Sequence, residues 1–104
     1  MTEPESGAQT FAVFLTPVRA GMPDDPTPEE AEAVGAHLAY YERLLDSGEL
    51  VLAGRTTAPP IWGVMVFEAG SLEEAERVAR ADPGVVAGVF EVRVQPFRVV
   101  LMRG

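Results

Sequence analysis

The residue best suited to acid–base chemistry is His37, the one histidine in the chain. Imidazole is the side chain that most readily gains and loses a proton near neutral pH, so His37 is the first candidate for a general base or acid. It shares a 3,4,3 spacing with Val34, Tyr41 and Leu44 along the flank of a predicted helix. The same spacing suits a partly buried histidine whose ring bonds a backbone carbonyl, and position alone favours that structural role.

Asp82 is the second candidate for chemistry. It comes at the predicted C-terminal end of a helix, where the helix dipole disfavours an anion. The carboxylate could cap the short turn that begins at Pro83, or it could orient an imidazole, and it has enough acceptor positions to do both. Pairing with Asp82 would also give His37 a partner, so we predict that the two side chains lie within hydrogen-bond reach, directly or through one water.

Two arginines are candidates for binding an anionic substrate. Arg19 lies in a long loop, and Arg55 follows a predicted strand. The residue type alone favours an ordinary surface arginine at each position. The chain shows no metal-ligand spacing and no phosphate-binding loop, so neither a metal nor a cofactor is expected.

Composition excludes several classes of protein. The 104 residues are 47% hydrophobic, carry a net charge of −8 and include no cysteine. One domain of ordinary size is expected over residues 10–104, after a flexible tail at 1–9. A disulfide scaffold and a thiol nucleophile are ruled out, and the acidity argues against nucleic-acid binding. The longest apolar run, 61–67, is far too short to span a bilayer, and no export signal is seen, so a cytoplasmic location is expected.

Hydrophobic periodicity predicts six elements in the order βαββαβ, which is the ferredoxin-like arrangement of an α+β protein. A capping box, Thr27 with Glu30, opens the first helix, and its apolar stripe is predicted to face the core. The last strand changes phase at Pro96, which predicts a strand in two pieces. The predicted strands are 10–16, 49–54, 62–68 and 90–101; the predicted helices are 28–47 and 72–81; and the apolar stripe comprises Ala31, Val34, Leu38, Tyr41 and Leu45.

Two further expectations come from this order. The strands at 10–16 and 62–68 are apolar on both sides, yet helices in this arrangement cover one sheet face, so the other face is expected to pack on a second copy in a homodimer. The loop at 17–27 is long and rich in proline, which suits a mobile lid bordering a pocket.

The chain resembles the YCII-related (YciI-like) domain family over residues 10–102. The resemblance rests most specifically on His37 in its helix, on the strand 50–54, and on Asp82-Pro83 followed by Ala87-Gly88. It implies a ferredoxin-like protomer that pairs sheet to sheet into a dimeric α+β barrel. It also implies a catalytic dyad in a pocket, which corresponds here to His37 and Asp82. A few relatives act as dehydrochlorinases on chlorinated hydroxyquinols, and most have no assigned reaction.

Three functions remain in competition at this point. The first is a cofactor-free enzyme of the lyase or elimination type, in which His37 moves a proton, Asp82 fixes its tautomer, and Arg19 or Arg55 grips a small anionic substrate. The second is a homodimer that binds a small molecule without catalysis. The third is a module that serves another protein. An apolar pocket reaching His37 would favour the first two over the third.

Overall fold

The computed structural model describes residues 9–104, and it has the predicted βαββαβ order with one short additional helix. The α+β, ferredoxin-like fold class is therefore confirmed. The expected tail at 1–9 lies outside the described residues except for Gln9, which begins the first strand. The elements are β1 (Gln9–Pro17), α1 (Pro28–Asp46), β2 (Leu50–Arg55), β3 (Gly63–Ala69), α2 (Leu72–Arg80), α3 (Pro83–Val86) and β4 (Phe90–Pro96).

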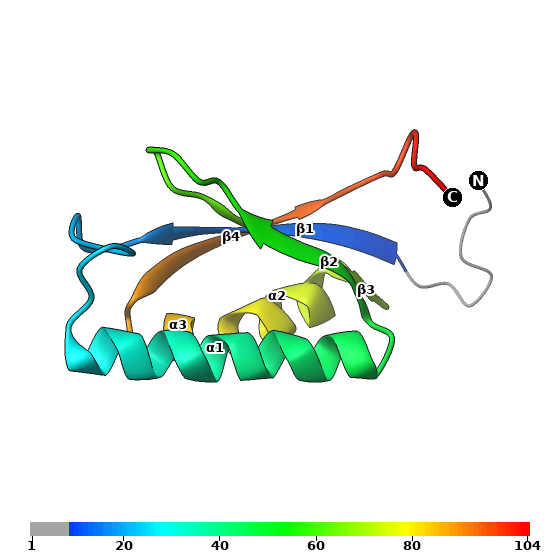
Figure 1. Cartoon of the computed structure of the whole chain (residues 1–104). Coiled ribbons are helices and arrows are strands. Elements are labelled where there is room, and N and C mark those ends of the chain that lie inside the picture. The colour runs from blue at the N-terminus through cyan, green and yellow to red at the C-terminus, as the bar shows by residue number, and fades with distance from the viewer. Residues whose placement is uncertain (1–8) are drawn as a thin grey trace.

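The four strands form one antiparallel sheet in the order β2-β3-β1-β4. The two strands predicted to be apolar on both sides, β1 and β3, are thus the central pair. All three helices lie on one side of this sheet, while the segment joining β2 to β3 extends from the other side (Figure 1). One face of the sheet is therefore covered by helices, and no helix of residues 9–104 covers the opposite face.

The main core lies between the sheet and the helices. Alternate residues of β1, namely Phe11, Val13 and Leu15, point toward the helices and are buried. Phe67 and Met65 of β3 stand opposite the first two of these and complete the layer. This alternation follows from the two-residue period of a strand, and it fixes which β1 side chains can reach a site under the helices.

The first helix begins and ends where the sequence predicts. Thr27 caps it in the predicted capping box with Glu30, and Pro28 occupies the first turn. After the helix, Gly48 has a φ of +86°, a left-handed conformation that a residue with a Cβ adopts at a cost.

The predicted inward face of α1 is only partly right, because Val34 and Tyr41 face inward whereas Ala31 and Leu45 do not. Leu38 and Leu45 are 59% and 55% exposed, whereas Tyr41 is 3% exposed. Turning the helix this way places His37 toward Asp82 and the hydroxyl of Tyr40 on the carbonyl of Val78. These polar contacts, which hydrophobic periodicity does not register, place the histidine on the inner face rather than on its flank.

The last strand is shorter than predicted. It ends at Pro96, and the residues after Phe97 form no strand within the described chain. Its last residue, Pro96, stands opposite Phe11 of β1, and the backbone N–H of Phe97 donates one further hydrogen bond to the carbonyl of Thr10. Among the helices of residues 9–104, none is long and apolar enough to cross a membrane.

Candidate functional site

The two predicted chemical residues meet beneath α1. Nδ1 of His37 lies 2.7 Å from Oδ2 of Asp82. The Asp82 side chain is fully buried, and that of His37 is 19% exposed. The predicted hydrogen-bond reach between the two side chains is therefore confirmed by a direct contact.

Asp82 carries out both of the roles that the sequence left open. Its Oδ1 accepts a hydrogen bond of 2.8 Å from the backbone N–H of Gly84, which caps α3, while its Oδ2 faces His37. The close packing at Gly84 depends on its lacking a side chain, because a Cβ there would lie 2.6 Å from the ring of Phe90. The local turn thus holds the carboxylate in one orientation.

This orientation assigns the tautomer of His37. An ionised carboxylate only accepts hydrogen bonds, so the imidazole must donate its Nδ1–H to Asp82. The neutral ring then has its lone pair on Nε2. A base of this kind can take a proton at Nε2 and leave an imidazolium whose Nδ1–H remains on the carboxylate.

The imidazole stands in an aromatic setting. Its ring centroid lies 5.2 Å from that of Tyr41 and 5.2 Å from that of Phe90. Both contacts hold the ring from its sides, because edge-on and tilted arrangements are favourable for aromatic pairs. The ring is consequently fixed by packing as well as by its hydrogen bond.

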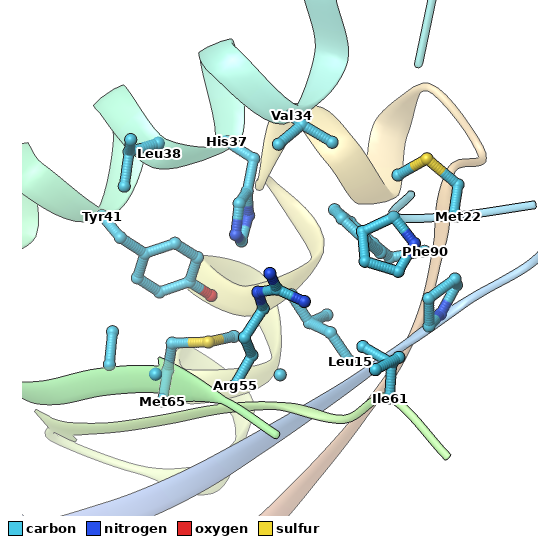
Figure 2. Close-up of a pocket in the computed structure, with 15 residues that line it drawn as sticks. Leu15, Met22, Val34, His37, Leu38, Tyr41, Arg55, Ile61, Met65 and Phe90 are labelled. Atoms are coloured by element: carbon cyan, nitrogen blue, oxygen red, sulfur yellow. The ribbon is translucent and has the colours of Figure 1, made fainter. Parts of the chain in front are cut away.

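A cavity of about 400 Å³ opens in front of His37. Figure 2 shows the imidazole pointing from α1 into this pocket, with side chains from the sheet on the opposite side. The lining of the cavity is mostly apolar. It includes Leu38, which is exposed in the structure. The apolar lining includes Leu15, Met22, Val34, Leu38, Ile61, Met65 and Phe90.

Of the two arginines proposed for an anion, the structure brings only Arg55 to the pocket. A register irregularity between Leu50 and Leu52 is the cause. Leu50 and Ala53 both stand opposite helix-facing residues of β3, although an odd number of positions separates them. After the irregularity, odd-numbered residues of β2 therefore face the helices, and Arg55, opposite Gly63, lies on the pocket side.

Arg19 is placed differently from the sequence-based expectation. Its guanidinium binds the carboxylate of Glu30 at 2.7 Å and also the backbone oxygen of Asp25, and it does not line the pocket. Arg19 therefore fastens its own loop to the start of α1. The hydrogen bonds from Arg19, followed by that from the backbone of Thr27, lower the pKa of Glu30 from 4.5 to about 2.

The long loop does border the pocket, as predicted. Pro17, Met22 and Pro23 are among the lining residues. Met22 is buried against Ala33 and Val89, which anchors the middle of the loop. Its position next to the pocket is confirmed, whereas its mobility stays a prediction.

Tyr41 is buried, as its place in the predicted apolar stripe indicates, but the sequence did not indicate that it also lines the pocket. Its buried hydroxyl has no hydrogen-bond partner within residues 9–104. The signal was its position one helical turn after His37, on the same face. No group of three or more metal-ligating side chains was found among the described residues.

Comparison with known proteins finds relatives of this chain and of its fold. The chain is 43% identical to protein YciI of Escherichia coli O6:H1 (strain CFT073) over 75 residues, which cover 62% of this chain and 76% of that protein, and equally identical to protein YciI of Shigella flexneri. Its fold is similar to that of 5-chloro-2-hydroxyhydroquinone dehydrochlorinase from Burkholderia phenoliruptrix AC1100, solved in complex with 2,5-dihydroxybenzoquinone. That match has a TM-score of 0.67 and 20% identity, and covers 86% of this chain and 93% of the other.

A family profile, that of the YCII-related domain, matches residues 11–98, which is most of the chain. The resemblance noted from individual motifs therefore extends across the whole fold just described. This protein is a member of the YCII-related domain family.

Proposed function

We propose that this protein is a cofactor-free enzyme that moves a proton on a small, largely apolar substrate, with His37 as the general base and Asp82 as the residue that positions it. The observation that carries the proposal is the direct contact between Nδ1 of His37 and the buried carboxylate of Asp82 at the wall of an apolar pocket. A buried carboxylate on one nitrogen makes the other nitrogen available as a base.

Elimination is the reaction class that this arrangement serves most simply. Nε2 of His37 takes a proton from a substrate carbon, and the electron pair of the broken C–H bond forms a new π bond. The leaving group departs with the electron pair of its own bond. The imidazolium that results is stabilised by Asp82, and it returns its proton to water before the next cycle.

Other features of the site support the proposal. Among the fifteen pocket-lining residues, His37 is the one side chain with a basic lone pair near neutral pH, so no second base competes with it. The name of the structurally similar dehydrochlorinase describes the loss of hydrogen chloride, an elimination, from a chlorinated hydroxyquinol. That likeness concerns the fold, and it makes elimination a natural first reaction to test here.

A homodimer is part of the proposal. On the sheet face away from the helices, Phe14 stands opposite Val64, and Leu52 stands opposite Val66. Leu52 and Trp62 are 51% and 41% exposed, and Phe14 packs its ring edge-on against Trp62. A second copy would cover this apolar face, and the family resemblance implies the same pairing.

The apolar C-terminal segment fits the same dimer. After β4 the chain carries exposed Phe97, Val100, Leu101 and Met102. Figure 1 shows this segment, coloured orange to red, running clear of the helices. Residues that alternate in a strand pattern but have no partner strand within residues 9–104 would gain one from a second copy.

The proposal is tested with a probe that requires only a base in an apolar pocket. In 5-nitrobenzisoxazole a base removes the proton from the ring carbon, the C–H electron pair forms the nitrile π bond, and the N–O bond breaks to give a coloured phenolate. We expect His37→Gln to lower the protein-catalysed rate by about 100-fold or more, and Tyr40→Phe, outside the pocket, to change it little.

The outcome separates the competing functions. A wild-type rate no higher than that of free imidazole, or a rate that survives His37→Gln, would contradict the enzymatic proposal. Saturable binding of small molecules without any turnover would identify the alternative, a non-catalytic ligand-binding dimer. A folded dimer that binds no small molecule would instead favour an interaction module for another protein.

A further inference from the structure

We propose that Tyr41 and Arg55 together bind the anionic oxygen of the ligand, so that the pocket selects small apolar monoanions over their uncharged counterparts. This inference rests on the proposed use of the pocket as a ligand site and deepens it by naming the ligand class. It assigns Tyr41 a role in recognition that the sequence did not indicate.

The first observation is an unpaired buried hydroxyl. Tyr41 is 3% exposed, it lines the pocket, and its Oη has no hydrogen-bond partner among the described residues. A buried polar group without a partner destabilises a fold, so such groups are rare and commonly serve a function. Figure 2 shows this hydroxyl pointing into the pocket, toward the side where the Arg55 guanidinium lies.

The adjacent tyrosine on the same helix does have a hydrogen-bond partner for its hydroxyl. The hydroxyl of Tyr40 donates a 2.6 Å hydrogen bond to the backbone oxygen of Val78. Tyr40 and Tyr41 therefore differ in one respect that matters here: the first hydroxyl is used inside the fold, and the second is left for the pocket.

The Tyr41 hydroxyl is a hydrogen-bond donor at all ordinary pH values. Burial of the ring, and secondarily the negative charge of Asp82, raise the pKa of Tyr41 well above its usual value. The hydroxyl stays protonated, and its proton is free to be donated to an oxygen of the ligand.

The second observation is an unpaired cation on the opposite wall. Arg55 is the one cationic side chain among the pocket-lining residues other than a protonated His37, and no carboxylate lines the pocket. Within residues 9–104 Arg55 makes no salt bridge, in contrast to Arg19, which is held by Glu30. Its guanidinium can offer paired N–H donors to an anionic oxygen group.

These two donors define the ligand. A hydroxyl and a guanidinium that line the same pocket suit an acceptor with negative charge, and the apolar remainder of a cavity of about 400 Å³ suits a compact hydrocarbon or aromatic body. The shared chemistry is an anionic oxygen, which a carboxylate or a phenolate can supply. An uncharged amide of the same shape would offer the exposed guanidinium of Arg55 no negative charge to pair with.

The test compares binding of benzoate, 4-nitrophenolate and uncharged benzamide by isothermal titration calorimetry. Wild type is expected to bind at least one of the two anions, and to bind benzoate more tightly than benzamide if the carboxylate is the preferred anion. Tyr41→Phe and Arg55→Gln are each expected to weaken binding of the preferred anion by about 10-fold or more. Tyr40→Phe, which alters the neighbouring hydroxyl, is expected to leave the affinity within about two-fold.

Each contrary result overturns the proposal. The proposal fails if wild type binds neither anion, or if it binds benzamide as tightly as the preferred anion. It also fails if Tyr41→Phe leaves the affinity for the preferred anion unchanged. The relative affinities of benzoate and 4-nitrophenolate distinguish a carboxylate ligand from a phenolate ligand.

Failure of this inference and failure of the enzymatic proposal are distinguishable. The His37→Gln variant is expected to lose about 100-fold or more of the elimination rate with 5-nitrobenzisoxazole and still to bind the preferred anion. Anion binding that depends on Tyr41 and Arg55, without turnover that depends on His37, would leave the recognition site standing and remove the catalytic role.

Discussion

His37 and Asp82 are 45 positions apart in the sequence, yet Nδ1 of the first lies 2.7 Å from Oδ2 of the second. The helix α1 presents the imidazole, and the cap of α3 presents the carboxylate. The backbone N–H of Gly84 donates a hydrogen bond to the other carboxylate oxygen, Oδ1, so the carboxylate that faces the imidazole is held in one orientation. This relationship determines which ring nitrogen can act as a base.

Asp82→Asn is expected to reverse the tautomer of His37. The amide oxygen is expected to keep the hydrogen bond from Gly84, so the NH₂ group would face Nδ1 as a donor and force the ring proton to Nε2. Nitrogen-15 NMR of the histidine ring should show a protonated Nδ1 in wild type and a protonated Nε2 in the variant. An Nδ1–H tautomer in both proteins would contradict the assignment.

Tyr40→Phe and Tyr41→Phe are expected to differ in their effect on stability. The first removes a hydrogen bond to Val78, which should lower the free energy of unfolding by about 0.5–1.5 kcal/mol. The second removes a buried hydroxyl that has no partner in the described chain, so stability should stay equal or rise. Urea denaturation measures both, and a clear loss of stability in Tyr41→Phe would show that its hydroxyl is already paired.

Glu30→Gln is expected to remove a stabilising ion pair that depends on pH. The side chain can still complete the capping box, so the change isolates the interaction with Arg19. Because folding lowers the pKa of Glu30 from 4.5 to about 2, its contribution is full above about pH 4.5 and is lost as the pH falls toward 2.

Urea denaturation across this pH range checks the prediction. The difference in free energy of unfolding between wild type and Glu30→Gln should be constant above about pH 5 and shrink below pH 4.5. Glu29→Gln, one position earlier in the same helical turn, is the matched control. A Glu30→Gln difference that persists unchanged at low pH would argue against the ion pair.

Val64→Arg is expected to disrupt the proposed homodimer. Val64 lies opposite Phe14 on the sheet face without helices, so an arginine there would bury an unpaired charge in the interface. The dimer should dissociate at concentrations about 100-fold or more above those for wild type, as measured by analytical ultracentrifugation. Ala36→Arg, on the exposed side of α1, is the control. A monomeric wild-type protein at micromolar concentration would count directly against the dimer.

The sequence was informative about elements and about the dyad. The capping box at Thr27, the two-sided strands and the break after Asp82 were sufficient to place the helices over one sheet face. With both helices on that face, a histidine on the inner flank of one could reach the end of the other. The pairing of His37 with Asp82 could therefore be predicted from the sequence.

The rest of the site depended on local geometry that leaves little trace in a sequence. Arg55 reaches the pocket because the register of β2 changes between Leu50 and Leu52, and one residue of slip reverses which side chains face inward. The sequence offered no feature that separated Arg19 from Arg55, because the ion pair of Arg19 with Glu30 forms only in the folded structure. The rotation of α1 likewise depends on polar contacts under the helix rather than on its apolar stripe.

The cytoplasmic location and the homodimer stay predictions. The fold and the family are shown, and the chemistry rests on one imidazole nitrogen in one apolar pocket. A decisive measurement must therefore connect that nitrogen to a rate.

The pH dependence of kcat/KM for 5-nitrobenzisoxazole, measured beside the NMR titration of the His37 ring in the same protein, makes this connection most directly. If Nε2 of His37 is the base, kcat/KM falls as the pH is lowered, because protonation removes one proton-accepting group. The midpoint of this fall in kcat/KM then coincides with the midpoint of the His37 NMR titration. A rate that passes unchanged through the titration of His37, or falls with a different midpoint, would contradict the account.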